Sequence, residues 1–188
     1  MIGYHVVRLA KFSGREARAK FWPWVAVVIG LTFVIGVIAV APMMLSTMTR
    51  MQQFAHEHPD QATVMSGPGS YQIRIEGNHP ELMPDPAPIF AAMEGIAALA
   101  IVLLAAAIVR RLHDAGRGGA WGLLPLPFLF FSFARMPAIF AAPQPDMGLF
   151  GLLALNSLLF LGAVGVLVLL LAQPGRAKEN RYGLPPEG

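Results

Sequence analysis

Four long apolar stretches, separated by polar segments, constrain the fold of this chain more than any other feature. A bilayer core about 30 Å thick is crossed by about 20 apolar residues in helical form, and each stretch reaches that length. Helix is expected because lipid offers no hydrogen-bond partner to the backbone of an open strand. Only 13% of the residues are charged, against about 25% in a typical soluble domain. The chain is therefore predicted to be an all-α integral membrane four-helix bundle, with spans at 23–45, 89–109, 121–142 and 149–172.

The basic residues are distributed unevenly along the chain and predict its orientation. Eleven of the fourteen Lys and Arg residues lie in three segments, whereas the loop between the first two spans holds two arginines against five acidic residues. Segments rich in Lys and Arg stay on the cytoplasmic side of a membrane. The sequence thus predicts a single membrane domain over 1–188, with cytoplasmic segments at 1–22, 110–120 and 173–188, a periplasmic loop at 46–88 and a periplasmic turn at 143–148.

The N-terminal segment is predicted to contain a short helix at the membrane interface. Ser13 and Glu16 are spaced as in a capping box, in which each side chain bonds to the other residue's backbone amide. A helix that began at Ser13 would place Arg15, Arg18 and Trp22 on one face. Trp22 and its aromatic neighbours would then lie at headgroup depth. We therefore expect this segment to anchor the chain, with its arginines directed towards lipid headgroups.

The 46–88 loop is polar and rich in turn-forming residues, so that much of it is expected to lack regular structure. Residues 71–75 alternate between apolar and polar as a short strand does. His56, His58 and His79 could suggest a metal site. However, histidines two residues apart do not share a helix face, and no fixed fourth ligand is evident. Neither a metal nor a cofactor is therefore expected.

The third stretch is the weakest of the four predicted spans. It contains Pro125, Pro127 and Pro137, and Arg135 lies towards its outer end. Residues 121–134 alone would extend about 21 Å as a helix, which is too short to cross. The span must therefore include Arg135 or else turn back within the membrane. A return would place the basic C-terminal tail outside, against the positive-inside rule, so a kinked crossing is predicted.

The three basic segments are expected to converge at the cytoplasmic face of the bundle. Arginine and carboxylate groups form strong paired hydrogen bonds, so that Asp114, among many arginines, is expected to be a structural counter-charge and not a proton carrier. The structural support of the central turn is assigned to His113, Gly116, Asn180 and Tyr182. The candidates for binding anionic ligands or lipid are Arg15, Arg18, Arg110, Arg111, Arg117 and Arg181.

Three motifs occur in order at the membrane boundaries. They are Phe-Ser-Gly-Arg-Glu-Ala-Arg-Ala-Lys-Phe-Trp at 12–22, Val-Arg-Arg-Leu-His-Asp-Ala-Gly-Arg at 109–117, and Glu-Asn-Arg-Tyr-Gly at 179–183, followed by Pro185. Because it has these three motifs in this order, the chain resembles the DUF 805 family from about residue 8 to 186. The resemblance implies a small four-span protein of the bacterial inner membrane, and it implies no reaction because the family's function is unassigned. The chain departs from the family at 118–121, where Gly-Gly-Ala-Trp replaces Ser-Gly-Trp-Trp, and in its longer outer loop.

The sequence favours a non-enzymatic membrane protein whose arginine-rich cytoplasmic face binds anionic lipid headgroups or an acidic partner. The alternative is a small transporter or channel component whose arginines attract anions to a cytoplasmic mouth. No catalytic residues are assigned, because no acidic pair, phosphate-binding glycine loop or zinc motif is found, and a lipid-headgroup enzyme is the least favoured hypothesis. Nucleic acid is not expected as a partner, since the positive-inside bias already explains the basic residues. A second copy of the chain or another membrane protein is left open as a partner.

Overall fold

The computed structural model describes residues 2–77, 79, 82–141, 144 and 146–186. Within these residues, four helices are long and apolar enough to cross a membrane, which confirms the predicted helical class with four candidate spans. The third of these is interrupted at Leu124 and Pro125, as its prolines predicted. The helices are α2 (Arg18–Glu57), α3 (Ala87–Asp114), the short 3-10 helix η2 (Gly119–Leu123) with α4 (Leu126–Ala141), and α5 (Met147–Ala172).

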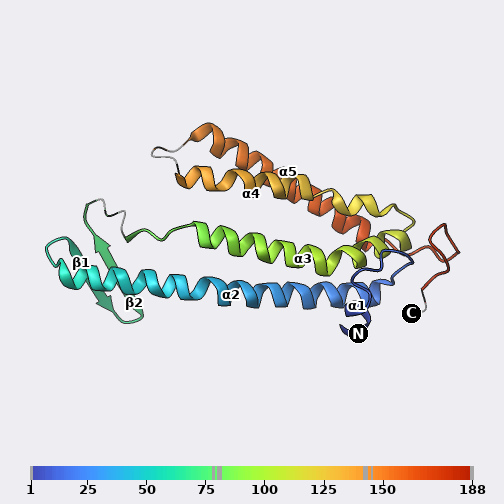
Figure 1. The fold of residues 1–188 in the computed structure, drawn as a ribbon, viewed down its shortest axis with the longest axis horizontal. Coiled ribbons are helices and arrows are strands. Elements are labelled where there is room, and N and C mark those ends of the chain that lie inside the picture. Colours follow the sequence, from blue (N-terminus) through green and yellow to red (C-terminus); the bar gives the residue numbers. More distant parts are fainter. Residues whose placement is uncertain (1, 78, 80–81, 142–143, 145, 187–188) are drawn as a thin grey trace.

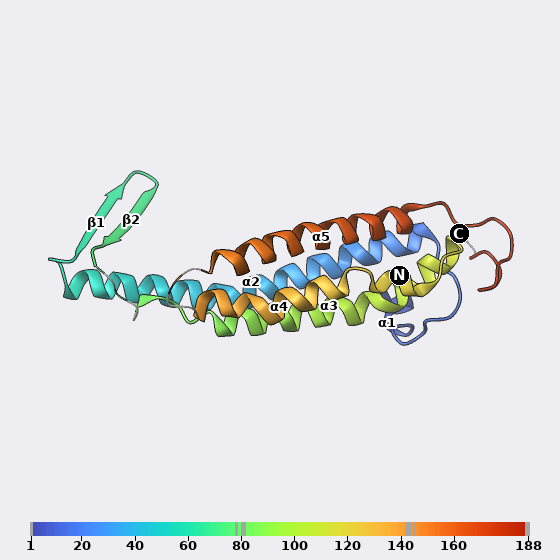
Figure 2. The same ribbon diagram turned by 90° about the horizontal axis from the view of Figure 1, so that it is seen from above.

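The long helices form two antiparallel pairs (Figure 1, Figure 2). α2 packs mainly against α3, and α4 packs mainly against α5, whereas fewer contacts join α3 to the second pair. In Figure 1 the second pair diverges from the first towards the end of the bundle that carries two β-strands. We call this the strand end. The short helix α1 (Ile2–Val6), the turn after α3 and the C-terminal tail all lie at the opposite end.

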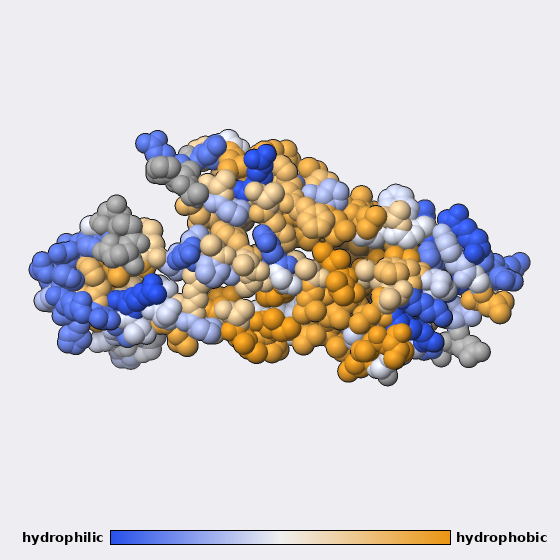
Figure 3. Space-filling model, in the orientation of Figure 1, coloured by the Kyte–Doolittle hydropathy of each residue, from blue (hydrophilic) through white to orange (hydrophobic). Residues whose placement is uncertain are grey.

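The sides of the bundle are apolar along most of their length. Figure 3 shows an apolar band between two polar ends. Large apolar side chains on these sides are exposed, among them Phe33 at 70%, Leu158 at 67% and Leu169 at 69%. An apolar surface of this extent marks contact with a membrane or a partner and is not suited to water. The distribution of surface polarity therefore agrees with the four candidate spans.

The best-buried apolar core lies where α2, α3 and α5 meet, near the end opposite the strands. Phe21 and Trp24 of α2 pack there with Leu112 of α3 and Leu171 of α5. Trp24 also donates its indole N–H to the carbonyl oxygen of Leu103 at 3.0 Å, which joins α2 to α3 within the membrane-spanning portion. This core fixes the helix ends that position the candidate site.

The first long helix extends well beyond the predicted span at 23–45 and includes the beginning of the polar 46–88 segment. Residues 46–57 contain no glycine or proline to end the helix. Gln53 donates a side-chain hydrogen bond to Glu57, one turn later, at 2.8 Å. Polar residues that are compatible with helix thus extend α2 past its apolar portion.

An antiparallel two-stranded sheet follows α2. β1 (Ala62–Gly67) pairs with β2 (Ser70–Ile75), with Val64 opposite Ile73. The strand predicted at 71–75 is therefore confirmed. Small parts of the predicted loop, third span, second turn and termini lie outside the described residues. These parts are residues 1, 78, 80–81, 142–143, 145 and 187–188.

The N-terminal segment differs from the interfacial helix predicted to begin at Ser13. A short helix is present, but it is α1, and α2 begins only at Arg18, without a side-chain cap. The predicted capping box is wrong because Glu16 is fully buried and accepts hydrogen bonds from Arg110. The Glu16 carboxylate is thus engaged in a charge-assisted pair with a guanidinium group of another helix, and residues 13–17 are not helical.

Candidate functional site at the basic end

The three basic segments lie together at the end of the bundle opposite the strands (Figure 1). Arg15 of the first segment donates to the carbonyl oxygen of Lys178 at 3.0 Å, and Asn180 donates to the carbonyl oxygen of His113 at 3.0 Å. The convergence predicted from the sequence is thereby confirmed. We call this part of the protein the basic end, and it comprises residues 2–20, 110–119 and 173–186.

Asp114, the last residue of α3, lies between two buried arginines. Its Oδ1 atom accepts a hydrogen bond from Nε of Arg15 at 3.0 Å and lies 2.9 Å from Nη2 of the same side chain. Its Oδ2 atom accepts from Nη1 of Arg111, one turn earlier on α3. All three side chains are more than nine-tenths buried. Asp114 therefore occupies the position expected of a structural counter-charge.

Both arginines also donate to backbone carbonyls near the C-terminus. Arg111 donates Nε to the carbonyl oxygen of Leu171 at 2.9 Å and another N–H to that of Gln173. The last carbonyls of a helix have no partner within the helix, so that Arg111 satisfies the end of α5. Arg15 donates to carbonyl oxygens of the tail at Arg176, Lys178 and Gly183.

A second buried ion pair joins the N-terminal segment to α3. Glu16 Oε2 accepts a hydrogen bond from Nε of Arg110 at 2.8 Å and lies 2.7 Å from its Nη2 atom. Arg110 also donates to the carbonyl oxygens of Arg8, at 3.0 Å, and Lys11. This one guanidinium group therefore holds the loop between α1 and α2 against the end of α3.

His5 of α1 lies beside this pair. Its Nδ1 atom is 3.6 Å from Oε1 of Glu16, and neither atom has a hydrogen-bond partner among the described residues. Its Nε2 atom donates to the carbonyl oxygen of Lys20 at 3.2 Å, and its ring stacks on Trp24 with centroids 4.7 Å apart. Burial lowers the pKa of His5, and burial raises the pKa of Glu16 although Arg110 opposes that rise.

Acidification should weaken the docking of α1 through His5. A histidine with a lowered pKa in the folded state contributes stability above its ordinary pKa of 6.5, and loses that contribution as the pH falls through the lowered value. The raised pKa of Glu16 acts in the opposite sense, since its contribution is lost as the pH rises. The His5→Phe variant keeps an aromatic ring against Trp24 and does not titrate, so that its difference from the wild type isolates the histidine.

The measurement is backbone hydrogen exchange over residues 3–9 at several pH values, corrected for the intrinsic pH dependence of exchange. We expect the protection of the wild type to fall below pH 6.5 relative to that of His5→Phe. His56→Phe replaces an exposed histidine near the strand end and should follow the wild type. Parallel pH profiles for the wild type and His5→Phe would show that His5 is not the group responsible.

His113 and Tyr182 form another contact between the segments. Their rings stack with centroids 3.7 Å apart and an angle of 7° between the planes. His113 Nδ1 donates to the carbonyl oxygen of Gly14 at 3.2 Å, and Asn180 Oδ1 accepts the backbone N–H of Tyr182 at 2.9 Å. Gly116 has a φ of +75°, which glycine adopts without strain. The residues assigned to the support of the turn therefore meet one another across the three motifs.

The structure corrects the assignment of three arginines as candidates for lipid binding. Arg15, Arg110 and Arg111 are 8%, 2% and 0% exposed. Their guanidinium groups bond to carboxylates and backbone carbonyls within the protein, so they are not available to a lipid headgroup. The positive-inside rule gives the side of the membrane on which a cation lies but not whether that cation is buried.

Exposed cations cover the outside of this buried network. The predicted candidates Arg18, Arg117 and Arg181 are all exposed, and Glu179 is the one exposed acidic side chain among the described residues of the basic end. Three more exposed cations were missed, although their place in the same basic segments is a signal that could have identified them. The exposed cations, as we call the full set, are Lys11, Arg18, Arg117, Arg176, Lys178 and Arg181.

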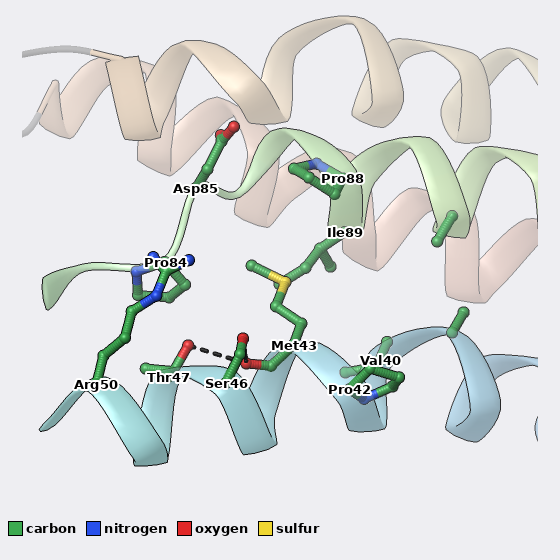
Figure 4. A pocket seen from close by; sticks show the side chains of 12 residues that line it. Val40, Pro42, Met43, Ser46, Thr47, Arg50, Pro84, Asp85, Pro88 and Ile89 are labelled. Atoms are coloured by element: carbon green, nitrogen blue, oxygen red, sulfur yellow. Dashed lines mark hydrogen bonds between the residues drawn. The ribbon is translucent and has the colours of Figure 1, made fainter. Parts of the chain in front are cut away.

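A separate pocket of about 380 Å³ lies at the strand end between α2 and the start of α3 (Figure 4). The hydroxyl groups of Ser46 and Thr47 both donate to the carbonyl oxygen of Met43, at 2.9 and 3.0 Å. Asp85 accepts a backbone N–H at the start of α3. Ser46, Thr47 and Asp85 thus have partners within the protein. Arg50 is the one basic side chain among the described residues that line the pocket, which therefore carries less positive charge than the basic end.

Comparison with known proteins identifies one family. The family model described as "Protein of unknown function (DUF805)" matches residues 9–184, a range that contains all three motifs of the basic end. No curated protein and no solved structure matches the chain.

Proposed function

The chain belongs to the DUF805 family of proteins of unknown function, and from its geometry we propose a non-enzymatic membrane protein whose exposed cations bind anionic lipid headgroups. We propose further that it resides in a bacterial inner membrane with both termini in the cytoplasm. In that orientation the basic end would face the anionic surface of the cytoplasmic leaflet.

The division of the cations into two groups supports this proposal most directly. The buried arginines at 15, 110 and 111 are paired with Glu16 and Asp114, which are the buried acidic residues of the basic end. The six exposed cations face only Glu179 among the described residues there. The surface next to the spans is thus strongly positive, and its positive charge is left for an external anion.

The magnitude of the attraction is sufficient for binding. A Lys or Arg close to an anionic membrane surface contributes roughly 1 kcal/mol. Six cations with one opposing carboxylate would therefore contribute several kcal/mol at low salt, and less at high ionic strength because surface charges are screened. The role of the buried network in this proposal is to hold the three segments together beneath one leaflet.

A catalytic role has less support. His113 Nδ1 is directed to the carbonyl oxygen of Gly14, and both Asp114 oxygens accept from arginines. A general acid or base must reach the proton that it transfers. Both oxygens of Asp114 and one ring nitrogen of His113 are engaged with internal partners.

A small transporter, the alternative considered from the sequence, is also less well supported. Asn156 is the buried polar side chain of α5, and its amide donates to the carbonyl oxygen of Phe128 and the hydroxyl of Ser132, both at 2.9 Å. Such bonds between helices stabilise membrane bundles. Asn156 thus joins α5 to α4 and is not left to line a path.

Replacing Arg18, Arg117 and Arg181 together by glutamine should strongly reduce the preference of the protein for anionic lipid. Loss of about 1 kcal/mol per cation corresponds to roughly a fivefold change in an association constant, before screening. The measurement is electron paramagnetic resonance of spin-labelled phosphatidylglycerol and phosphatidylcholine around the full chain in vesicles. The fraction of each lipid immobilised by the protein gives their relative association constants at low and high salt.

The matched control removes the same charge from elsewhere on the surface. Arg50, Arg74 and Arg135 are exposed and lie outside the basic end, and their replacement by glutamine should leave the preference for phosphatidylglycerol unchanged. The proposal fails if both triple variants keep the selectivity of the wild type, or if both lose it equally.

A further inference from the structure

An apolar groove of about 350 Å³ lies in the half of the bundle nearest the basic end. It runs between the two helix pairs, and every residue that lines it is apolar. Ala105 and Ile108 of α3 form one wall, Leu126 and Leu129 of α4 form another, and Val164 of α5 closes it. The groove exists because few contacts join α3 to α4 and α5. In a bilayer, a groove of this kind would face acyl chains.

A polar pocket of about 400 Å³ lies at the basic end itself. Its size, like that of the groove, falls in the range of about 300–1,000 Å³ that is usual for small-ligand sites. The Tyr182 ring in its wall is held by stacking on His113, and the Arg181 guanidinium carbon lies 4.8 Å from the centre of that ring. The lining residues are Gly116, Arg176, Glu179, Asn180, Arg181 and Tyr182.

The polar pocket and the apolar groove are close together, because both include residues of the turn at 116–119. A β-carbon at Gly118 would lie 3.9 Å from both Nη2 of Arg181 and the hydroxyl oxygen of Tyr182. Gly119, the next residue, lines the apolar groove. Consecutive Cα atoms are about 3.8 Å apart, so that the Arg181 side chain and the groove are each next to one of two adjacent glycines.

We propose that the basic end holds one phosphatidylglycerol molecule, with its phosphate in the polar pocket beside Arg176 and Arg181 and one acyl chain in the apolar groove. This inference rests on the proposed function and narrows it from general attraction to a single defined site. Arginine is suited to phosphate through its fixed set of N–H donors. The carboxylate of Glu179 can accept hydrogen bonds from the glycerol hydroxyls of the headgroup, and the two arginines leave the pocket with a net positive charge that favours a lipid of net negative charge.

The composition of the cavities argues for a lipid and against a small anion. Inorganic phosphate would occupy the polar pocket and leave the groove empty. A lipid without a phosphate would fill the groove but bring no anion to the pocket, where Arg176 and Arg181 outnumber Glu179. A molecule with both parts satisfies both cavities, because burying apolar surface and pairing charge act together.

The test of the acyl-chain site uses native mass spectrometry of the full chain, released from nanodiscs of equal phosphatidylglycerol and phosphatidylcholine. We expect the wild type to retain one phosphatidylglycerol. Ala105→Phe would fill the groove and should reduce the retained fraction about tenfold or more. Ala98→Phe adds the same ring to an exposed position on α3 and should retain lipid like the wild type. Leu126→Trp is a second groove-filling variant if the first does not fold.

The test of the headgroup site compares two single substitutions under the same conditions. Arg181→Gln should reduce the retained phosphatidylglycerol several-fold relative to phosphatidylcholine, whereas Arg135→Gln removes an equal charge near the strand end and should not. Excess inorganic phosphate should not displace the lipid, because the chain in the groove contributes to its retention.

Each of the following outcomes would overturn the inference. They are a wild type that retains no lipid, a retained lipid without preference for phosphatidylglycerol, and retention that survives both groove-filling variants. Displacement by phosphate alone would likewise exclude the acyl-chain contact. The spin-label experiment described above distinguishes a failure of this inference from a failure of the proposed function. In that experiment Ala105→Phe should keep the general preference of the exposed cations for anionic lipid, even if it no longer retains a single bound lipid.

Discussion

Replacing Asp114 by alanine should destabilise the protein by about 3–5 kcal/mol, the range measured when one partner is removed from a buried ion pair. The reason is that Arg15 and Arg111 would both remain buried without their shared carboxylate. Arg15 also orders the C-terminal tail, so the loss should extend from the end of α3 to residues 176–183. For a chain of this length, that loss corresponds to a fall in Tm of roughly 6–20 °C.

Thermal unfolding of the full chain in detergent micelles would measure this effect. Glu179→Ala is the matched control, since it removes an exposed carboxylate from the same end of the protein and should shift Tm little. Hydrogen exchange should show lost protection in the tail of Asp114→Ala and not in the control. Equal melting temperatures for the two variants would mean that the buried network does not stabilise the basic end.

Replacing Arg110 by methionine should have an effect of similar size, about 3–5 kcal/mol. The substitution leaves the fully buried Glu16 without its guanidinium partner. It also removes the donors to the carbonyl oxygens of Arg8 and Lys11. We therefore expect lower Tm together with faster hydrogen exchange in the loop between α1 and α2.

The double variant Arg110→Met with Glu16→Gln separates pairing from burial. With both charges absent, no uncompensated ion remains, and the double variant should be less destabilised than the sum of the single changes. A coupling energy of about 0.5–3 kcal/mol is usual for residues in direct contact. Glu94→Gln, at an exposed position on the same helix, should combine additively with Arg110→Met. If the free-energy changes of Arg110→Met and Glu16→Gln were also additive, the two side chains would not form a direct ion pair.

Much of the fold could be predicted because it depends on composition over long windows. The four apolar stretches specified helices, since lipid permits little else. The clustering of basic residues predicted which segments share an end, and the contacts of Arg15 with the tail confirm it. Helix boundaries were less accurate. α2 continues through polar residues to Glu57 because nothing in 46–57 ends a helix.

The candidate site was predicted only in part, and the failure at Glu16 shows why. Its spacing from Ser13 matched a capping box, a pattern that depends on four consecutive residues. In the structure its partner is Arg110, 94 positions away in the chain. A local pattern cannot reveal that a distant guanidinium group competes for the same carboxylate.

The sequence by itself determined that this chain has four candidate spans, a basic end formed by three separate motifs, and membership of the DUF805 family. Only the tertiary structure decided which arginines are paired inside and which are exposed. Arg15 and Arg18 lie three residues apart in one motif, yet the first is buried against Asp114 and the second is exposed. The physical reason is that a buried charge requires a counter-charge, and Asp114 is brought to Arg15 from 99 positions away by the packing of the helices.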